Sequence, residues 1–525
     1  MSDPLTYSSP PGICWTRCNM AEVTPGVITP LGWSFYGPIV DVSSRRGFAQ
    51  LGAIPKSAIA YPDDVAEHLI GVFHGRPVLN ISTLRAIMSG FPGVSGDDVE
   101  RDIAGSVRDG IVDRSYGWRV PAVLAKAGVA LLRSGKAATT VLAQTTEWWS
   151  ARFGPTGIVD GTPPRTALAE AVAHFGEAVV AQSRNRMIFQ GASSQVIALA
   201  EKSGHPELAG ALLSAPGGIE EAAVADDLRA LAAGRLDLGT FVARHGFHGP
   251  NAGDITAQSW RENPAPLERL VKRLQEAGSD GPRRDDNARA AAVASVLADL
   301  PALQRPAAKV ALRMAPSAAR SLERSKVAFV MSLDGARAAA RAVGAELVQA
   351  GRLDYVDDVF FLFVEELLGS AQHDLRSPVA ERRANNIRHQ GLEMVTNTWE
   401  GDPPMRTAAT TAVSTVTEVA GIGASPGIVE GRVKIVLDAG ADTDVDIDDI
   451  LVCPVTDPSW VSLMMVAGGL VIDIGGTASH GAIIARELGV PCVIGTTTGT
   501  TDLRDGDLVR IDGAAGVVTV LDRAH

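Results

Sequence analysis

The stretch that decides the fold of the C-terminal part is Gly469–Gly495, which reads GLVIDIGGTASHGAIIARELGVPCVIG. It starts with a short apolar run, turns at Gly475-Gly476, and continues with helical spacing over His480–Leu488. Gly489-x-Pro491 follows directly, and glycine and then proline are typical of the residues after a helix end. We therefore predict a buried strand, a tight turn and a helix that begins at Ser479 or His480.

The start of this predicted helix is a favourable place for a histidine that carries phosphate. Unpaired backbone N–H groups and the helix dipole favour an anion there. The same dipole opposes a charged imidazole, so we expect His480 to stay neutral, the form that attacks phosphorus. Thr477 and Ser479 place hydroxyl groups nearby. From the residues alone, His480 is either a phosphoryl-accepting nucleophile or a histidine that only caps a helix.

The pattern of residue types changes twice along the chain. Residues before about 400 have mainly helical periodicity, clearest at 165–187, 286–300, 305–350 and 354–368, after 40 irregular residues. Residues 401–420 are small, polar and rich in threonine, which predicts a linker. Short strand-like runs follow at 428–436, 450–455, 469–474, 492–494, 508–511 and 517–521. We predict a multidomain chain with a mainly α-helical body (1–400), a linker (401–420) and a compact α/β domain (421–523).

Composition and charge exclude several classes of function. The 525 residues are 46% hydrophobic and 21% charged, as in a globular enzyme. The net charge is −12, and residues 421–525 contribute −9 of it, from 6 Lys/Arg and 15 Asp/Glu. This balance argues against nucleic acid or an anionic membrane as a partner. We see no apolar run of about 18 residues and no leader sequence, so we expect a cytoplasmic protein. The four cysteines are too few for a disulfide scaffold, and we expect no metal site.

The segment Gly475-Gly476-x-x-Ser479-His480-Gly481-Ala482-Ile483-Ile484-Ala485-Arg486 resembles the phosphohistidine signature of the phosphoenolpyruvate-utilising enzymes, which include phosphoenolpyruvate synthase, pyruvate phosphate dikinase and rifampin phosphotransferase. Gly421-x-Gly423-Ala424-Ser425-Pro426-Gly427 is similar to the start of that family's mobile domain. The resemblance implies a swivelling β/β/α domain with a covalent phosphohistidine at His480, supported by Thr477, Ser479, Gly481 and Arg486. Ala478 departs from the pattern, because the synthases and dikinases usually have Thr there. This weakens the argument for pyruvate or phosphoenolpyruvate as a reactant.

The body resembles the substrate domain of rifampin phosphotransferase-like proteins at 15–31, 245–264 and 357–362. The resemblance implies that the body binds a small hydroxylated acceptor of phenol or alcohol type. In the glycine-rich segment His248 is a candidate general base for the acceptor hydroxyl, or else a packed loop histidine. Asp254, Arg324 and Lys326 are further substrate-binding candidates, with capping or exposed helical positions as the alternative.

Full-length relatives have an ATP-grasp domain before the Thr29-Pro30-Leu31 segment, and we find no phosphate-binding loop of Gly-x-x-x-x-Gly-Lys-Ser/Thr type. The resemblance therefore implies one subunit of a two-component phosphotransferase of the dikinase type, organised like phenylphosphate synthase. ATP and Mg²⁺ would bind a separate ATP-grasp subunit, and this chain would bind no cofactor directly. Two alternatives stay open: a non-catalytic or regulatory phosphohistidine protein, and dehydration of an alcohol by way of its phosphate.

Overall fold

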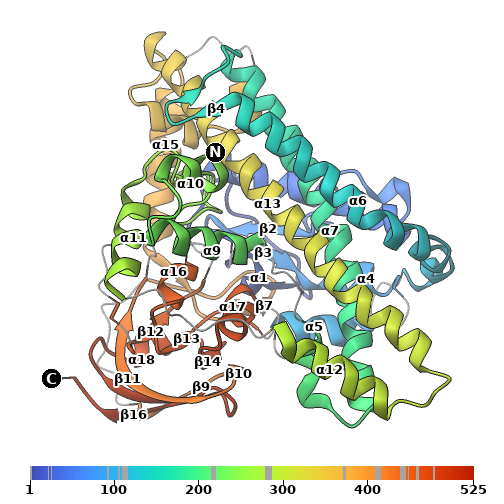
Figure 1. The fold of residues 1–525 in the computed structure, drawn as a ribbon. Helices are drawn as coiled ribbons and strands as arrows, with labels where there is room; N and C mark the ends of the chain where they lie inside the picture. The colour runs from blue at the N-terminus through green and yellow to red at the C-terminus, as the bar shows by residue number, and fades with distance from the viewer. Residues whose placement is uncertain are drawn as a thin grey trace.

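The computed structural model describes residues 3–524, with gaps at 22, 25, 92–93, 105–106, 109–110, 112–115, 214–219, 278–285, 370–373, 408–415, 438–444, 447, 457–459 and 477–478. The described residues form a large helical part followed by a sheet domain near the C-terminus, which Figure 1 shows in orange and red. Within the described ranges, no helix is both long enough and apolar enough to cross a bilayer.

Three long helices form the frame of the body, namely α6 (Val120–Arg152), α7 (Pro164–Lys202) and α13 (Arg305–Gln349) (Figure 1). Their contact faces carry small residues as well as large ones, so the helices approach closely. Ala336, Ala339 and Ala340 of α13 are fully buried, and Phe175 of α7 packs edge-on against Phe35 with ring centroids 5.0 Å apart.

Shorter helices surround this frame: α1 (Cys18–Ala21), α2 (Pro30–Ser34), α3 (Val40–Leu51), α4 (Ile81–Met88), α5 (Gly96–Ala104), α8 (Ala209–Leu213), α9 (Glu220–Ala232), α10 (Leu238–His245), α11 (Ala265–Ala277), α12 (Asp286–Asp299), α14 (Val364–Leu368) and α15 (Arg376–Gln390).

A small antiparallel sheet joins the beginning of the body to its end. Its strands β1 (Cys14–Thr16), β2 (Ile70–Phe73), β3 (Arg76–Asn80) and β7 (Thr398–Glu400) lie in the order β2-β3-β1-β7. Two further pairs are β4 (Phe153–Gly154) with β5 (Gly157–Ile158), and β6 (Leu392–Met394) with β8 (Met405–Thr407). The small sheet fixes the position of residue 17, which follows β1 directly.

The C-terminal sheet has eight strands in the order β10-β14-β13-β12-β11-β15-β16-β9. Their bounds are β9 (Glu418–Ala420), β10 (Ile422–Ser425), β11 (Ile428–Ile435), β12 (Ile450–Cys453), β13 (Gly469–Ile472), β14 (Cys492–Ile494), β15 (Leu508–Asp512) and β16 (Val517–Asp522). The four strands β11 to β14 are parallel and the outer pairings are antiparallel. Alternate residues enter two apolar layers, one of which also includes α16 (Val461–Met464) and α17 (His480–Leu488).

The two edge strands of this sheet are consecutive in the chain and are separated only by Gly421. The Gly421 N–H donates to the carbonyl of Gly516, at the turn between β15 and β16, at 2.8 Å. The sheet therefore curls until its two edges meet at Gly421.

Most of the predicted elements are present. The predicted helices at 165–187, 286–300 and 305–350 correspond to α7, α12 and α13, and the predicted helix His480–Leu488 has the bounds of α17. The prediction of one helix over 354–368 is wrong, because a 3₁₀ segment (Val356–Phe361) ends in the extended residue Leu362 before the short α14 begins. Strands β8 and β9 fall inside the range predicted as a linker, of which 408–415 lie outside the described residues.

Candidate active site

The first turn of α17 is capped by its own sequence. Ser479 has extended backbone angles, and its Oγ accepts the N–H of Ala482 at 3.3 Å, while its N–H donates to the Gly476 carbonyl at 2.9 Å. At the other end Gly489 adopts a left-handed conformation with φ +70°. His480 is thereby fixed as the first residue of a nine-residue helix.

Gly481 allows α17 to begin in direct contact with the ends of two parallel strands. A Cβ atom at this position would lie 2.6 Å from both Ile472 Cδ1, at the end of β13, and Thr456 Oγ1, after β12. Thr456 is itself buried. The backbone next to His480 therefore lies beside Thr456, at the carboxyl edge of the sheet.

Asp473 connects the end of β13 to the segment that follows β14, and the sequence prediction missed it. Its buried carboxylate accepts Thr496 Oγ1 at 2.7 Å and the Thr500 N–H at 3.1 Å, and it also accepts the Thr500 hydroxyl. Thr500 belongs to the short helix α18 (Gly499–Asp502). The only signal in the sequence was an acidic residue directly after an apolar strand.

The structure places the predicted phosphate-supporting residues at two different ends of α17. Ser479 and Gly481 flank His480 in the chain, whereas Arg486 is six residues further on, about 9 Å along the helix axis. Arg486 Nη1 donates to the carbonyl of Ala424 in β10 at 3.3 Å, so it holds the helix against the sheet. Thr477, and the position of the His480 side chain, lie outside the described part of the structure.

His248 lies in the body, buried in an aromatic environment. Its ring centroid is 4.3 Å from that of Phe247 and 6.0 Å from that of Trp260, and the backbone N–H of Trp260 donates to the His248 carbonyl at 2.7 Å. Burial lowers the pKa of His248 to about 3, helped by the charge of His245 and opposed by that of Asp334. The imidazole is therefore neutral near pH 7.

The three remaining substrate-binding candidates do not form one cluster. Asp254 stabilises the loop in which it lies, because its Oδ1 accepts hydrogen bonds from the N–H and from the hydroxyl group of Thr256, both at 2.9 Å. On α13, Arg324 donates to Thr139 Oγ1 at 3.1 Å, and Lys326 pairs with Glu323 at 3.3 Å. Lys326 lies about 16 Å along the axis of α13 from Arg337, the residue that donates to the Asp254 carbonyl.

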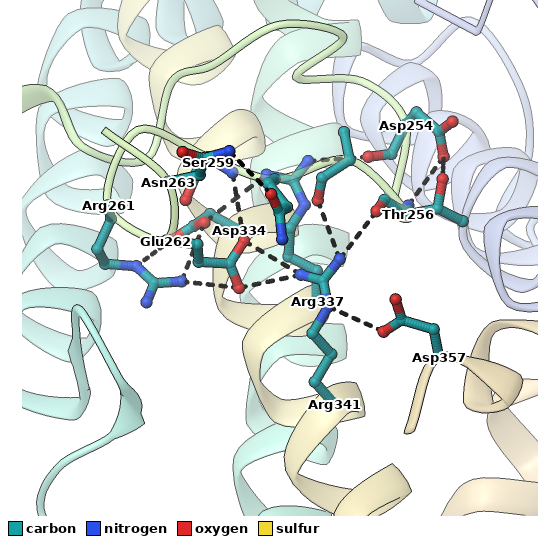
Figure 2. A network of polar contacts seen from close by, with 12 residues as sticks. Asp254, Thr256, Ser259, Arg261, Glu262, Asn263, Asp334, Arg337, Arg341 and Asp357 are labelled. Atoms are coloured by element: carbon teal, nitrogen blue, oxygen red, sulfur yellow. Dashed lines mark hydrogen bonds and ion pairs between the residues drawn. The ribbon is translucent and has the colours of Figure 1, made fainter. Parts of the chain in front are cut away.

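A buried ionic network holds the glycine-rich loop on α13 (Figure 2). Asp334 is fully buried and accepts Arg261 Nε at 3.0 Å, Arg261 Nη2 at 3.2 Å and Trp149 Nε1 at 2.7 Å. Arg337 donates to the carbonyls of Ala252 and Asp254 at 2.7 and 3.0 Å and lies 3.6 Å from Asp334. Burial tends to lower the pKa of Arg261, but Asp334 and Glu262 raise it above its usual value. The sequence prediction missed this network.

Around the network, Arg341 adds a second layer of contacts. It pairs with Glu262 at 3.0 Å and with Asp357 at 3.2 Å, and it donates to the carbonyl of Thr256 at 2.9 Å (Figure 2). The part of the loop that follows His248 is thus bound to helix α13 by both Arg337 and Arg341. In the described part of the chain, no group of three His, Cys, Asp or Glu side chains is arranged to hold a metal ion.

The sheet domain touches the body at the same edge that carries α17. Val455 and Ile474, just beyond β12 and β13, are buried in one apolar cluster with Ala21 of α1, and Cys18 packs against it. We call these four residues the docking contact. Since Thr456 follows Val455 and adjoins Gly481, the start of α17 lies next to the docking contact.

Comparison with known proteins defines the class of this sheet domain. Residues 445–516 match the family of mobile domains of phosphoenolpyruvate-utilising enzymes. Residues 194–324 match the fourth domain of rifampicin phosphotransferase. The chain thus contains a phosphoenolpyruvate-utilising enzyme mobile domain together with a rifampicin phosphotransferase segment, which confirms the resemblance drawn from the sequence.

Individual relatives agree with this assignment. A rifampicin phosphotransferase of Streptomyces sp is 32% identical over 342 residues, which cover 60% of this chain and 38% of the relative. An uncharacterised protein of Mycobacterium tuberculosis is 33% identical over 53% of this chain and 30% of its own. The phosphoenolpyruvate synthase of Aeropyrum pernix is 48% identical over 101 residues, or 19% of this chain and 12% of the relative. The chain therefore spans less than two-fifths of the length of each of these relatives.

Among solved structures, an NMR structure of Enzyme I covers 68% of this chain and 80% of its own at 15% identity. Its TM-score is only 0.17, which is too low to inform the fold.

Proposed function

We propose that this chain carries a phosphoryl group on His480 to a hydroxyl group of a small organic acceptor, of phenol or alcohol type, bound by the helical body. The observation that carries the proposal is that residues 445–516 match the mobile-domain family and include His480, the first residue of the capped helix α17. The rifampicin phosphotransferase segment in the body supports a hydroxylated acceptor.

The proposed reaction has two balanced steps. In the first, which is of the dikinase type, an imidazole nitrogen of His480 attacks the β-phosphorus of ATP, a P–N bond forms, the P–O bond to AMP breaks and AMP leaves; water then takes the terminal phosphoryl group as inorganic phosphate, so one phosphoryl group stays on His480. In the second, the acceptor oxygen attacks the phosphohistidine, a P–O bond forms, the P–N bond breaks and the electron pair returns to the imidazole. The acceptor's hydroxyl proton leaves to a base, for which we propose His248.

His248 would act as a weak base in this scheme. Its pKa of about 3 keeps it neutral and able to accept the hydrogen bond of an acceptor hydroxyl, which orients that oxygen. At pH 7 the imidazolium formed would give this proton up to water, so His248 ends the step neutral. We propose Asp254, Arg324 and Lys326 only as residues around the acceptor, since their present contacts hold the loop and α13.

For the donor we propose ATP with Mg²⁺ on a separate ATP-grasp subunit. This division is supported by the resemblance to two-component phosphotransferases, together with the matches of residues 194–324 to the fourth domain of rifampicin phosphotransferase and of residues 445–516 to a mobile domain. Calorimetry tests it directly: the chain alone is expected not to bind ATP measurably. Tight binding of ATP by the isolated chain would overturn the two-component proposal but leave the carrier role of His480 untouched.

The carrier role is tested by phosphorylation with labelled ATP and an ATP-grasp protein encoded in the same genome. We expect an acid-labile, base-stable phosphate on the chain that is absent from His480→Ala. His245→Ala is a matched control, because His245 is also at a helix terminus but pairs with Asp227 at 2.9 Å. Label retained in His480→Ala would refute the assignment. Stable label that no hydroxylated acceptor discharges would favour a regulatory phosphohistidine protein instead.

A further inference from the structure

The segment that connects β1 to α1 lies where the sheet domain meets the body. Arg17 occupies this segment, between Thr16 at the end of β1 and Cys18 at the start of α1. Cys18 and Ala21 belong to the docking contact, together with Val455 and Ile474. Arg17 therefore precedes, in the chain, the residues on which the sheet domain rests.

The backbone of Arg17 and one edge of its guanidinium are held rigidly. The Arg17 N–H donates to the Asn397 carbonyl at 3.0 Å, and Arg17 Nε donates to Asn397 Oδ1 at 2.7 Å. Thr16 Oγ1 reinforces the same turn by donating to the Asn397 carbonyl at 3.0 Å. Asn397 directly precedes β7, so the anchor is part of the small antiparallel sheet.

The other edge of the guanidinium is available. No hydrogen-bond partner of Arg17 Nη1 or Nη2 occurs among residues 3–524 as the structure describes them. A fork of two N–H groups on a fixed guanidinium matches two oxygens of a phosphoryl group. Neighbouring Arg76 adds positive charge, but its Nη groups already donate to the carbonyls of His74, His389 and Leu392.

Arg17 interacts through its charge with the sheet domain, and its neighbour Cys18 packs against the cluster that contains Ile474 of that domain. Burial lowers the pKa of Arg17, and Asp473 of the sheet domain acts in the opposite direction through its charge. Asp473 immediately precedes Ile474 of the docking contact and accepts a hydrogen bond from Thr496. Arg17 is thus near the same strand end from which α17 begins.

We propose that Arg17 is a catalytic residue of the second transfer step, and that it binds the phosphoryl group on His480 when the sheet domain is docked as in this structure. This inference rests on the proposed function. Two N–H groups of Arg17 would neutralise the charge that develops on the phosphoryl oxygens while the P–N bond breaks and the P–O bond to the acceptor forms. The sheet domain is strongly acidic, so this arginine would also draw it to the body.

The docking contact itself provides the assay. Ile474→Cys introduces a thiol next to Cys18, and a short thiol-to-thiol crosslinker then reports how often the docked arrangement is populated. Potassium phosphoramidate, a chemical phosphoryl donor to histidine, phosphorylates His480 without any partner subunit, and phosphorus NMR verifies the phosphohistidine. The crosslinking rate is measured before and after phosphorylation, with Arg17 intact or changed to Gln or Lys.

With Arg17 intact we expect phosphorylation to raise the crosslinking rate about tenfold, as for a charge-assisted bidentate contact. Arg17→Gln should abolish the increase, and Arg17→Lys, which keeps the charge but lacks the fork, should give an intermediate value. A purely structural role of Arg17 would lower the rate equally with and without phosphate. Arg46→Gln, on an exposed ion pair of the body with Glu177, is the control and should behave like wild type.

The outcomes separate the two proposals. If phosphoramidate yields no phosphohistidine that is lost in His480→Ala, the proposed function fails and the role of Arg17 fails with it. If His480 is phosphorylated but the increase in crosslinking is absent, or is the same in Arg17→Gln, only the role of Arg17 is refuted.

Discussion

Removing the buried carboxylate of Asp334 should destabilise the body more than any exposed charge change. Asp334 compensates the charges of Arg261 and Arg337, which are both almost completely buried. Asp334→Ala leaves two buried guanidinium groups without this partner, and removal of one member of a buried pair costs about 3–5 kcal/mol. The Trp149 indole N–H also loses its acceptor. We expect the free energy of unfolding of the body to fall by that amount.

Urea unfolding followed by tryptophan fluorescence measures this change, and hydrogen exchange shows where the structure loosens. The loop over 246–263 should exchange faster, because Arg261 and Arg337 no longer hold it on α13. Asp226→Ala is the control: Asp226 pairs with Arg229 at 2.8 Å on an exposed surface, where such pairs contribute about 0–1 kcal/mol. A loss below 1 kcal/mol for Asp334→Ala, or unchanged exchange in the loop, would refute the role given to the network.

Two further predictions concern the site itself. Gly481→Ala should destabilise the sheet domain by about 1–3 kcal/mol and slow phosphorylation of His480, because the added Cβ atom would overlap Ile472 and Thr456. An unchanged melting temperature of this variant would contradict the close packing. The pKa of His248 is depressed from 6.5 to about 3, so between these pH values the unfolded chain binds a proton that the folded chain does not. Its contribution to stability is therefore complete above pH 6.5 and is lost as the pH falls, by about 2 kcal/mol at pH 5. Unfolding of wild type and His248→Gln at pH 7.5 and pH 5 should show this difference, and equal pH dependence would place the imidazole in contact with water.

The sequence predicts α17 well because the signals that define it are local. Ser479 caps the helix and Gly489 ends it, and both interactions involve residues within four positions. The predicted helix at 354–368 fails for the opposite reason. Asp358 there accepts the N–H of Tyr355 at 3.0 Å and pairs with Arg383 of α15, so a contact with a distant residue favours the 3₁₀ turn.

The ionic network around Asp334 could not be predicted from the periodicity of the sequence. Asp334 and Arg337 stand three residues apart in an alanine-rich helix, where such a pair is typical of an exposed face. Their burial depends on Arg261, which is 73 positions away. The carrier role that we propose for His480 rests on its neighbours in the chain, whereas the role that we propose for Arg17 depends on the contact between the sheet domain and the body.

The meeting of both sheet edges at Gly421 has a mechanical consequence for a domain that, as we propose, moves as a carrier. A pull from the preceding segment reaches β9, which pairs with β16 on one edge, and one residue later it reaches β10, which pairs with β14 on the other. The pulling force is thus distributed over both edges of the sheet and does not separate one edge strand from its neighbour. In a carrier that turns between two sites, such a joint would transmit rotation without separating the strands, and the strand ends beside Gly481 would keep their spacing.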